Sequence, residues 1–299
     1  MAAIYEFGGL DGATIQVASA ARLDDFRARF FGLWPLRRIE ATDDDRVDIA
    51  IDAISDGFHI RHGALEGGAV EVPDAAEAAN QLVGLLAAEL LSRRGDLIGT
   101  HAGAAAGPGG VILLVGDSLS GKSTLALQLA RRGARFFGDD RIALAPGGFG
   151  GGRAPAAIGL GLTPRMRLPV HPGAGATLAA FVEGNAVVEH MDWQGEPTVA
   201  YIDLAIDAFP VAAFGDSAPV AALVLPRRRD DDADVLFLDD ATQNEAALAL
   251  LRQSTAPGME SRALVAAVAQ VARAVPCLRL EYGSSAAACD LLCQRFDIS

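Results

Sequence analysis

The first seventy residues alternate short apolar runs with breaks at Asp and Gly, a pattern typical of β-strands. The runs that we expect to form strands are 4–7, 14–19, 46–54, 58–62 and 69–72. Between the second and third runs, the apolar positions of 21–34 predict a helix. This part of the chain carries no recognisable chemistry.

A longer helix is predicted to begin at Asp74. The segment Asp74-Ala-Ala-Glu77 resembles a capping box, and the apolar positions that follow it to Leu91 keep a helical period. Arg93, Arg94 and Gly95 then supply the cations and the glycine that are common where helices end. We therefore expect residues 1–94 to form an α+β domain of unknown role and residues 95–299 to form a second, larger domain.

Strands and helices alternate in the larger segment, which predicts an α/β fold. The expected strands are 97–106, 111–117, the two runs that flank Asp139 and Asp140 within 134–144, and 156–162, 186–193, 198–204, 220–226 and 234–238. The expected helices are 122–132, 242–253, 259–274 and a last one that ends near Phe296. A turn at 107–110 favours a hairpin between the first two strands. The glycine-rich run 146–153 is expected to be a mobile loop, which either closes over a substrate or is a slack connection.

Composition narrows the classes of function that the chain can serve. The 299 residues carry 25 Lys and Arg against 38 Asp and Glu, a formal charge of −13, and 51% of them are hydrophobic. Such a chain is not disordered throughout, and its acidity argues against nucleic-acid or anionic-membrane partners, which need clustered cations. No apolar stretch reaches the roughly 20 residues of a membrane span. Three cysteines and a start unlike a signal peptide indicate a cytoplasmic protein with reduced thiols.

One segment carries a specific chemical signal. Residues 116–123, GDSLSGKS, fit the pattern G-x-x-x-x-G-K-[ST] between an apolar run and a predicted helix. Backbone amides at such a helix start suit phosphate oxygens, the lysine reaches the β- and γ-phosphates, and the serine hydroxyl ligates Mg²⁺. Lys122 is the only lysine in the chain. The expected nucleotide-binding residues are Gly116, Asp117, Ser118, Leu119, Ser120, Gly121, Lys122, Ser123 and Thr124, with ATP and Mg²⁺ as cofactors.

Phosphoryl transfer also needs carboxylates near the metal and the attacking oxygen, and two acidic pairs are candidates. Asp139 and Asp140 follow a short strand directly after the predicted phosphate-loop helix, where the next parallel strand would end beside the loop. Asp239 and Asp240 end the run VLFLDD, which looks like a Walker B strand but also stands where a helix N-cap is expected. A β-turn role is the alternative for the first pair.

The segment 101–144 resembles the catalytic core of HPr kinase/phosphorylase and its HPr-kinase-related relatives. The resemblance rests on His101, the loop 116–123, the Arg132-Gly133 helix end and the Asp139-Asp140 pair. It implies an α/β phosphate-loop kinase core, similar to the HPr kinase C-terminal domain and to the phosphoenolpyruvate carboxykinase-like fold, preceded by the small α+β N-terminal domain.

The same resemblance implies roles for individual residues. Asp139 would be the catalytic carboxylate that accepts the substrate hydroxyl proton, with His101 beside it and Lys122 on the phosphates. Asp140 would help to hold the metal that Ser123 ligates. For His101 alone, a core histidine without chemical function is the alternative.

Arginines further along the chain are candidates for the substrate side of the site. Arg165 and Arg167 could face the transferred phosphate or an acidic substrate, because Arg holds such groups bidentately. Ordinary surface arginines are the alternative.

Departures from the bifunctional enzymes shape the expected function. Thr124 stands where they have Glu, Leu119 stands where a further Gly is usual, and only IGLGL remains of their long signature loop. The chain is closest in character to the precursor-peptide serine kinases of lasso-peptide clusters. We expect phosphorylation of a serine on a peptide or small protein other than HPr, without phosphorolysis.

Two alternatives to a peptide kinase stay open. One is a kinase for a small hydroxylated molecule, and the other is a regulatory module that binds the nucleotide without transfer. A homo-oligomer is compatible with the sequence.

Overall fold

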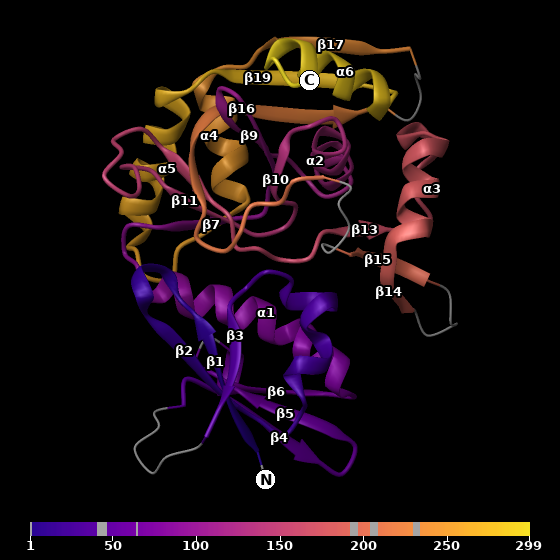
Figure 1. The fold of residues 1–299 in the computed structure, drawn as a ribbon. Coiled ribbons are helices and arrows are strands. Elements are labelled where there is room, and N and C mark those ends of the chain that lie inside the picture. Colours follow the sequence, from indigo (N-terminus) through magenta and orange to yellow (C-terminus); the bar gives the residue numbers. More distant parts are fainter. Residues whose placement is uncertain (1, 41–46, 64, 192–196, 204–208, 230–233) are drawn as a thin grey trace.

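The computed structural model describes residues 2–40, 47–63, 65–191, 197–203, 209–229 and 234–299 and has a mixed α/β architecture. Arg46, Asp192, Trp193 and Leu204, which belong to expected strands, lie outside the described residues. The helices and strands fall into an N-terminal sheet covered by one long helix, a larger sheet with helices on both faces, and a small third sheet (Figure 1).

In the N-terminal part that the structure describes, the strands form one sheet of order β3-β1-β2-β4-β5-β6. Their bounds are β1 Ala3–Gly8, β2 Thr14–Ser19, β3 Leu36–Ile39, β4 Ile49–Ile54, β5 Gly57–Arg61 and β6 Ala69–Val72. β2 and β4 pair in parallel and their neighbours pair antiparallel. Alternate residues such as Ile15 and Val17 are buried, as a sheet with one covered face requires.

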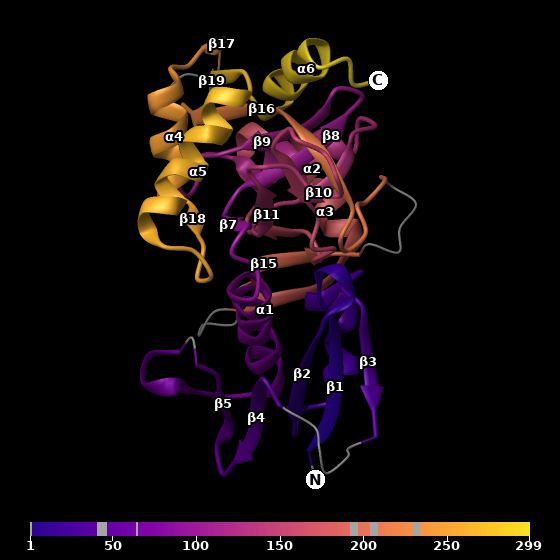
Figure 2. The ribbon, with the colours of Figure 1, turned by 90° about the vertical axis from the view of Figure 1, so that its left-hand side faces the viewer.

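Helix α1, Ala75–Ser92, covers the inner face of this sheet and lies between it and the rest of the chain (Figures 1 and 2). It begins as predicted, because the Asp74 side chain accepts a hydrogen bond from the amide of Glu77 at 2.8 Å. Leu82 and Leu86 are fully buried on its core side.

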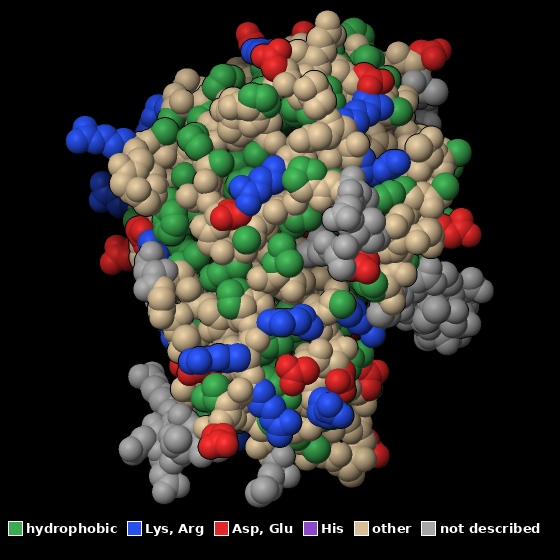
Figure 3. Space-filling view, in the orientation of Figure 1, with side chains coloured by type: hydrophobic (Ala, Val, Ile, Leu, Met, Phe, Trp, Pro, Cys, Tyr) green, Lys and Arg blue, Asp and Glu red, His purple; other side chains and the backbone are tan. Residues whose placement is uncertain are grey.

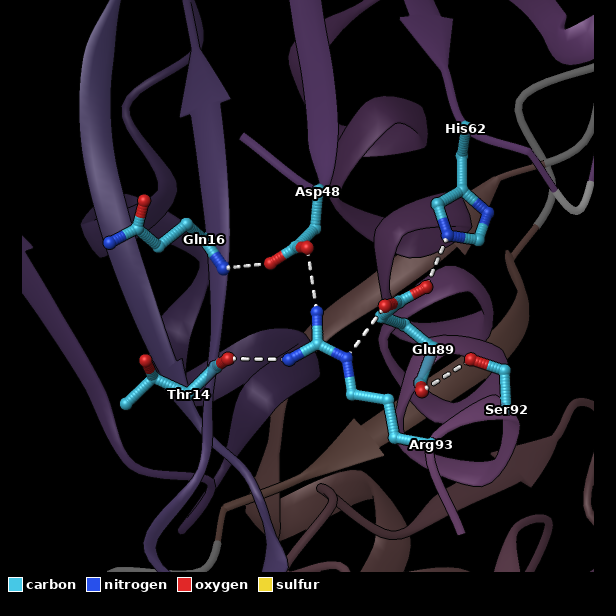
Figure 4. Close-up of polar contacts among 7 residues, drawn as sticks. All are labelled: Thr14, Gln16, Asp48, His62, Glu89, Ser92 and Arg93. Carbon is cyan, nitrogen blue, oxygen red and sulfur yellow. Dashed lines mark hydrogen bonds and ion pairs between the residues drawn. The ribbon is translucent and has the colours of Figure 1, made fainter. Parts of the chain in front are cut away.

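The C-terminal end of α1 is fixed to the sheet by charged side chains (Figure 4). Arg93 lies 2.6 Å from Asp48 and 2.7 Å from Glu89, and it donates to the carbonyl of Thr14 at 2.7 Å. Burial alone would raise the pKa of Glu89, but the hydrogen bonds from His62 and Arg93 outweigh it and lower that pKa. The position of α1 is therefore determined at both ends.

The prediction of one regular helix over 21–34 is wrong, because this segment is only partly helical and its helices are not α-helices. The structure has a short 3₁₀ helix, Leu23–Phe26, followed by a π-helical turn, Arg27–Phe31. Phe30, Phe31 and Trp34 are all buried, and the Trp34 indole donates to the carbonyl of Gly8 at 2.7 Å. Burying this aromatic cluster determines the local backbone more strongly than the helical period does.

The described strands of the larger sheet follow the order β10-β8-β9-β16-β12-β11-β7-β18, with β19 and β17 continuing from β16. Their bounds are β7 Ile98–Thr100, β8 Gly103–Gly107, β9 Gly110–Leu114, β10 Arg135–Gly138, β11 Ile142–Ala145, β12 Ala156–Ile158, β16 Ser217–Arg228, β17 Leu236–Asp240, β18 Ser254–Thr255 and β19 Cys277–Tyr282. The expected hairpin is confirmed as the antiparallel pair β8–β9. The single strand expected at 97–106 is divided into β7 and β8 at His101.

Helices cover both faces of this sheet (Figure 2). Their bounds are α2 Lys122–Ala130, α4 Gln243–Arg252, α5 Ser261–Ala274 and α6 Ser285–Arg295. Along β9, Val111 and Leu113 join the core under α4 and α5, whereas Ile112 and Leu114 join the core under α2 and α6. The apolar run VILLV is therefore buried on both sides, as expected for a central strand.

A third, smaller group lies beside α2. Here β13 Arg165–Arg167, β15 Pro197–Ile202 and β14 Ala186–Met191 form a sheet in that order, with helix α3, Ala176–Asn185, against it. Leu127 of α2 shares a buried cluster with Met166 and Leu178. No helix in the described ranges is long and apolar enough to cross a membrane.

Candidate phosphate-binding and catalytic site

The segment 116–121 connects central strand β9 to the start of α2, the arrangement that the motif predicts. Gly121 is the N-cap of α2 and has φ +92°, and a Cβ there would overlap the hydroxyl of Tyr282. That hydroxyl donates to the carbonyl of Ser120 at 2.9 Å and holds the loop from β19. Leu119, which replaces a usual glycine, has φ +68° and is 64% exposed. A side chain in this left-handed conformation costs about 1 kcal/mol.

The first backbone amides of α2 have no acceptor within the helix. Within the part of the chain that the structure describes, the amides of residues 121–124 donate to no acceptor. Unpaired amides at a helix N-terminus and the positive end of the helix dipole together favour a bound anion. The geometry of this loop therefore suits a bound phosphate group.

Lys122 is folded over the same loop. The side chain is buried, and its Nζ donates to the carbonyls of Gly116 and Asp117 at 2.9 and 2.8 Å. Burial lowers the pKa of Lys122 and Arg167 adds to this effect, while Asp117 and Asp140 oppose it. The ammonium is thus positioned at the loop by neutral carbonyl groups.

The acidic corner 139–140 follows strand β10. This strand pairs antiparallel with β8, which pairs antiparallel with β9, so β10 runs parallel to β9 with one strand between them. The ends of both strands therefore lie at the same edge of the sheet, and the corner reaches the loop. The Ser123 hydroxyl contacts the backbone carbonyl of Asp139 at the long distance of 3.4 Å.

Asp140 is the centre of a charged cluster. Its carboxylate lies 2.7 Å from Arg165, 3.1 Å from His101 Nε2 and 3.2 Å from Arg141. Burial would raise the pKa of Asp140, but the nearby cations, Arg165 first, outweigh it and lower that pKa. Asp140 is therefore ionised at neutral pH.

Asp139 has a different environment. It is 6% exposed, and its Oδ2 accepts a hydrogen bond from the amide of Arg165 at 3.2 Å. Burial raises the pKa of Asp139 to about 7, and Asp140 adds to the effect while Arg165 opposes it. Asp139 lines a small inner cavity together with Phe30 and Tyr201. The two adjacent carboxyls thus have pKa values that are shifted in opposite directions.

His101 lies in the break between β7 and β8, where its amide donates to the carbonyl of Gln253 at 2.8 Å. The family resemblance implies that the His101 side chain lies beside Asp139. In the structure the His101 side chain contacts Asp140, because Asp139 points into the interior. Burial lowers the pKa of His101, and Asp140 opposes this effect. The half-exposed ring is not a core histidine.

Both predicted substrate arginines lie at the site. Arg165 and Arg167 stand two residues apart on β13, so they project from the same face. Arg165 contacts Asp140, and Arg167 donates to the Ser118 hydroxyl at 3.1 Å. Thr124 Oγ1 contacts the sulfur of Met166 at 3.6 Å. The small third sheet therefore supplies one wall of the site.

A cleft of about 390 Å³ joins these groups. Its lining residues are His101, Ser118, Leu119, Gly121, Lys122, Ser123, Thr124, Asp140, Arg165, Met166, Arg167, Leu168, Pro169, His171, Val199 and Arg228. Sequence reasoning missed Arg141, His171 and Arg228. The first of these adjoins the acidic pair and was open to prediction, whereas no spacing pattern marks the other two.

The residues present fit a Mg²⁺ bound with nucleotide. Among the described residues, no group of three or more His, Cys, Asp or Glu gathers as a dedicated metal site. Mg²⁺ in phosphate-loop sites takes one hydroxyl, one or two carboxylates, phosphate oxygens and waters, so a large acidic cage is not needed. Ser123 and Asp140 line the same cleft and would supply that hydroxyl and that carboxylate.

The second acidic pair is not part of this site. β17 runs antiparallel to β19, while β19 and β16 run parallel to β9. Asp239 and Asp240 therefore end at the opposite edge of the sheet from the loop. The helix N-cap expected there is also wrong by two residues, since Thr242 caps α4 in a capping box with Glu245.

The glycine-rich loop 146–153 also lies away from the cleft, and the expectation that it closes over a substrate is wrong. None of its residues lines the cleft. Gln270 donates to the carbonyl of Pro146 at 3.0 Å, and the Arg94 guanidinium lies 5.6 Å from the centre of the Phe149 ring. The loop follows the far end of β11 from Asp140, so it cannot cover the loop at 116–121.

Comparison with known proteins gives a distant likeness. No protein-family model matches the chain, and no curated protein matches it. The solved Hpr(Ser) kinase/phosphatase from Coxiella burnetii is similar at 13% sequence identity, over 66% of this chain and 89% of that chain, with a TM-score of 0.31. A superposition this loose carries no weight for function, which is inferred below from the contacts of the site itself.

Proposed function

We propose that the chain is an ATP- and Mg²⁺-dependent kinase that transfers the γ-phosphoryl group to a serine hydroxyl of a peptide or small protein. The observation that carries this proposal is the cleft in which Lys122 and Ser123 of the loop face Asp140 and Arg165. A phosphate site without transfer needs only the loop. Carboxylates and arginines beyond the γ-position are what phosphoryl transfer adds to it.

The loop residues bind the nucleotide in this proposal. The amides of 121–124 hold phosphate oxygens, and Lys122 moves from its carbonyl partners to the β- and γ-phosphates. Ser123 and Asp140 would hold Mg²⁺, which would neutralise part of the phosphate charge. Arg165 and Arg167 orient the transferred group, because a planar guanidinium matches phosphate oxygens bidentately.

The opposite pKa shifts of the acidic pair suit two roles. The serine oxygen forms a bond to the γ-phosphorus while the bond from that phosphorus to the bridging oxygen breaks, and ADP leaves with the electron pair. The hydroxyl proton passes to a carboxylate. A base works best with a pKa near the working pH, as for Asp139, and a metal ligand must stay ionised, as Asp140 does. Because the Asp139 side chain lies in the inner cavity, it must turn toward the cleft to accept the proton.

The cellular setting and the acceptor are part of the same proposal. Cys277, Cys289 and Cys293 are free thiols, in keeping with the cytoplasm where ATP is abundant. Thr124 and the short IGLGL segment favour forward transfer alone, on an acceptor such as the precursor peptides of lasso-peptide clusters.

Incubation with ATP, Mg²⁺ and a library of seryl peptides tests the proposal by mass spectrometry. We expect some peptides to gain one phosphoryl group, HPr to gain none, and phosphopeptide with millimolar phosphate to give no pyrophosphate. Transfer only to small alcohols would identify a metabolite kinase. Tight ATP binding without transfer to any acceptor would identify a regulatory module.

A further inference from the structure

A second cavity opens beside the cleft, between α1 and the larger sheet. It has a volume of about 210 Å³ and its lining is largely apolar. On the α1 side, Gly84, Ala87 and Ala88 line it, a spacing of three and four residues that places small side chains on one face. On the other side, Ile142 and Leu160 supply larger apolar groups. The small residues of α1 leave the room that this cavity occupies.

The polar end of this cavity is the charged cluster of the site. His101 and Asp140 line both the cavity and the phosphate cleft, and Arg141 lines the cavity beside them. A molecule that binds in the cleft at Asp140 can therefore extend its adjacent groups into an apolar space.

One buried hydroxyl in the cavity has no partner. Thr100 is 3% exposed and lines the cavity, and its Oγ1 makes no hydrogen bond to any described residue. An unsatisfied buried polar group costs about 1–3 kcal/mol of stability. The cavity thus combines apolar walls with polar residues at one end, His101, Asp140 and Arg141, and the Thr100 hydroxyl is enclosed in its wall.

We propose that this cavity binds an apolar side chain adjacent to the serine of the acceptor peptide. This inference rests on the proposed kinase function and gives the N-terminal segment a role, because α1 forms one wall of the acceptor site. The seryl hydroxyl then lies near Asp140, which lines both the cavity and the cleft.

The test compares two matched peptides on the full-length protein. The probes are acetyl-Leu-Ser-Leu-amide and acetyl-Asn-Ser-Asn-amide, which have similar volumes and differ in polarity on both sides of the serine. Binding is measured by calorimetry with Mg²⁺ and a non-hydrolysable ATP analogue, and transfer is measured separately with ATP. We expect the leucine peptide to bind at least about 10-fold more tightly, because one buried Leu side chain is worth that much or more.

Substitutions on α1 locate the effect. Ala88→Leu fills the cavity and should remove the preference, whereas Ala76→Leu, the same change at a half-buried position of α1 outside the cavity, should keep it. Thr100→Val should keep the preference and raise the melting temperature of the free protein, since a buried unpaired hydroxyl is removed.

Equal binding of the two peptides, or of neither, would overturn the inference, as would a preference that survives Ala88→Leu. A preference that behaves as expected without any transfer would leave the cavity assignment standing and would overturn the kinase function instead. The two proposals therefore fail in different measurements.

Discussion

At the scale of one residue, Lys122 is the side chain on which the proposed phosphate site depends most. Its ammonium is buried and held by the carbonyls of Gly116 and Asp117, which a bound phosphate would replace. Lys122→Ala should weaken ATP binding by about 30-fold or more, because a buried charged partner is lost. Lys122→Arg should fail as well, since the larger planar fork does not fit a point-charge site.

Calorimetry with ATP and Mg²⁺ measures this effect, and Arg262→Ala on the exposed face of α5 is the control for loss of one positive charge. Near-normal ATP binding by either Lys122 variant would contradict the phosphate-loop assignment.

Asp139 gives a second residue-scale prediction, on stability. Its pKa rises from the ordinary 3.8 to about 7 through burial, so the folded protein holds a proton there that the unfolded chain releases. The protonated group is compatible with the folded state at low pH, and stability falls as pH rises from about 4 to about 7. The difference between 3.8 and about 7 corresponds to a cost of up to about 4 kcal/mol above pH 7.

Asp139→Asn removes this cost, since the amide stays neutral. Without nucleotide or Mg²⁺, the variant should be more stable than the natural protein at pH 8, and the difference should shrink toward pH 4. Urea unfolding at several pH values measures it. A variant that is less stable at every pH would show that the Asp139 carboxylate is ionised in the fold.

At the scale of elements, the sequence predicted the features that depend on neighbouring residues, such as element order and helix caps. The order strand, phosphate loop, helix follows from VILLV and the motif at 116–123, and the Asp74 cap follows from the hydrogen bond to Glu77. Strand order was not accessible in this way. β10 lies two strands from β9, and β17 runs antiparallel at an edge, because these pairings depend on the whole sheet.

The site was predictable to a similar degree. The sequence brought together His101, Lys122 and the acidic pair, which lie in adjoining elements. The sequence could not predict that His101 contacts Asp140 and not Asp139. The two carboxyls are adjacent in the chain, and only the folded backbone determines which of them points inward. Arg228 comes from a distant strand, so only the tertiary fold places it in the cleft.

The direction of β17 carries an element-scale prediction. Asp239→Asn should change turnover by no more than about twofold, as expected for a surface site remote from the cleft. Asp140→Asn should reduce turnover by about 100-fold or more, because it removes a charged group beside the reacting phosphate. Steady-state transfer assays on the two variants measure the contrast. Equal losses, or a larger loss for Asp239→Asn, would restore VLFLDD as the metal-binding strand.

At the scale of the whole molecule, the N-terminal segment shares one core with residues of the larger sheet and of the small third sheet. The rings of Phe30 and Tyr201 lie 5.1 Å apart, and those of Trp34 and Phe214 lie 4.9 Å apart. The Thr163 hydroxyl also donates to the carbonyl of Ala28 at 2.8 Å. On the face drawn in Figure 3, basic and acidic side chains are interspersed over both parts.

This shared core predicts that residues 95–299 do not fold well alone. Without α1 and its sheet, apolar groups such as Leu160 and Tyr201 would be exposed to water. We expect the isolated segment to aggregate or to melt well below the full chain. Circular dichroism against temperature measures this. A cooperative transition at the temperature of the full chain would show that 95–299 is an independent domain, as the sequence division at residue 94 implies.

The central claim is that this cleft transfers the γ-phosphoryl group of ATP. The most direct measurement is transfer of radiolabel to a seryl peptide from γ-labelled ATP, with α-labelled ATP as the comparison, on the natural protein and on Lys122→Ala and Arg262→Ala. We expect label from the γ-position only, lost with Lys122→Ala and kept with Arg262→Ala. Label from the α-position, or γ-label transfer that survives Lys122→Ala, would contradict the account.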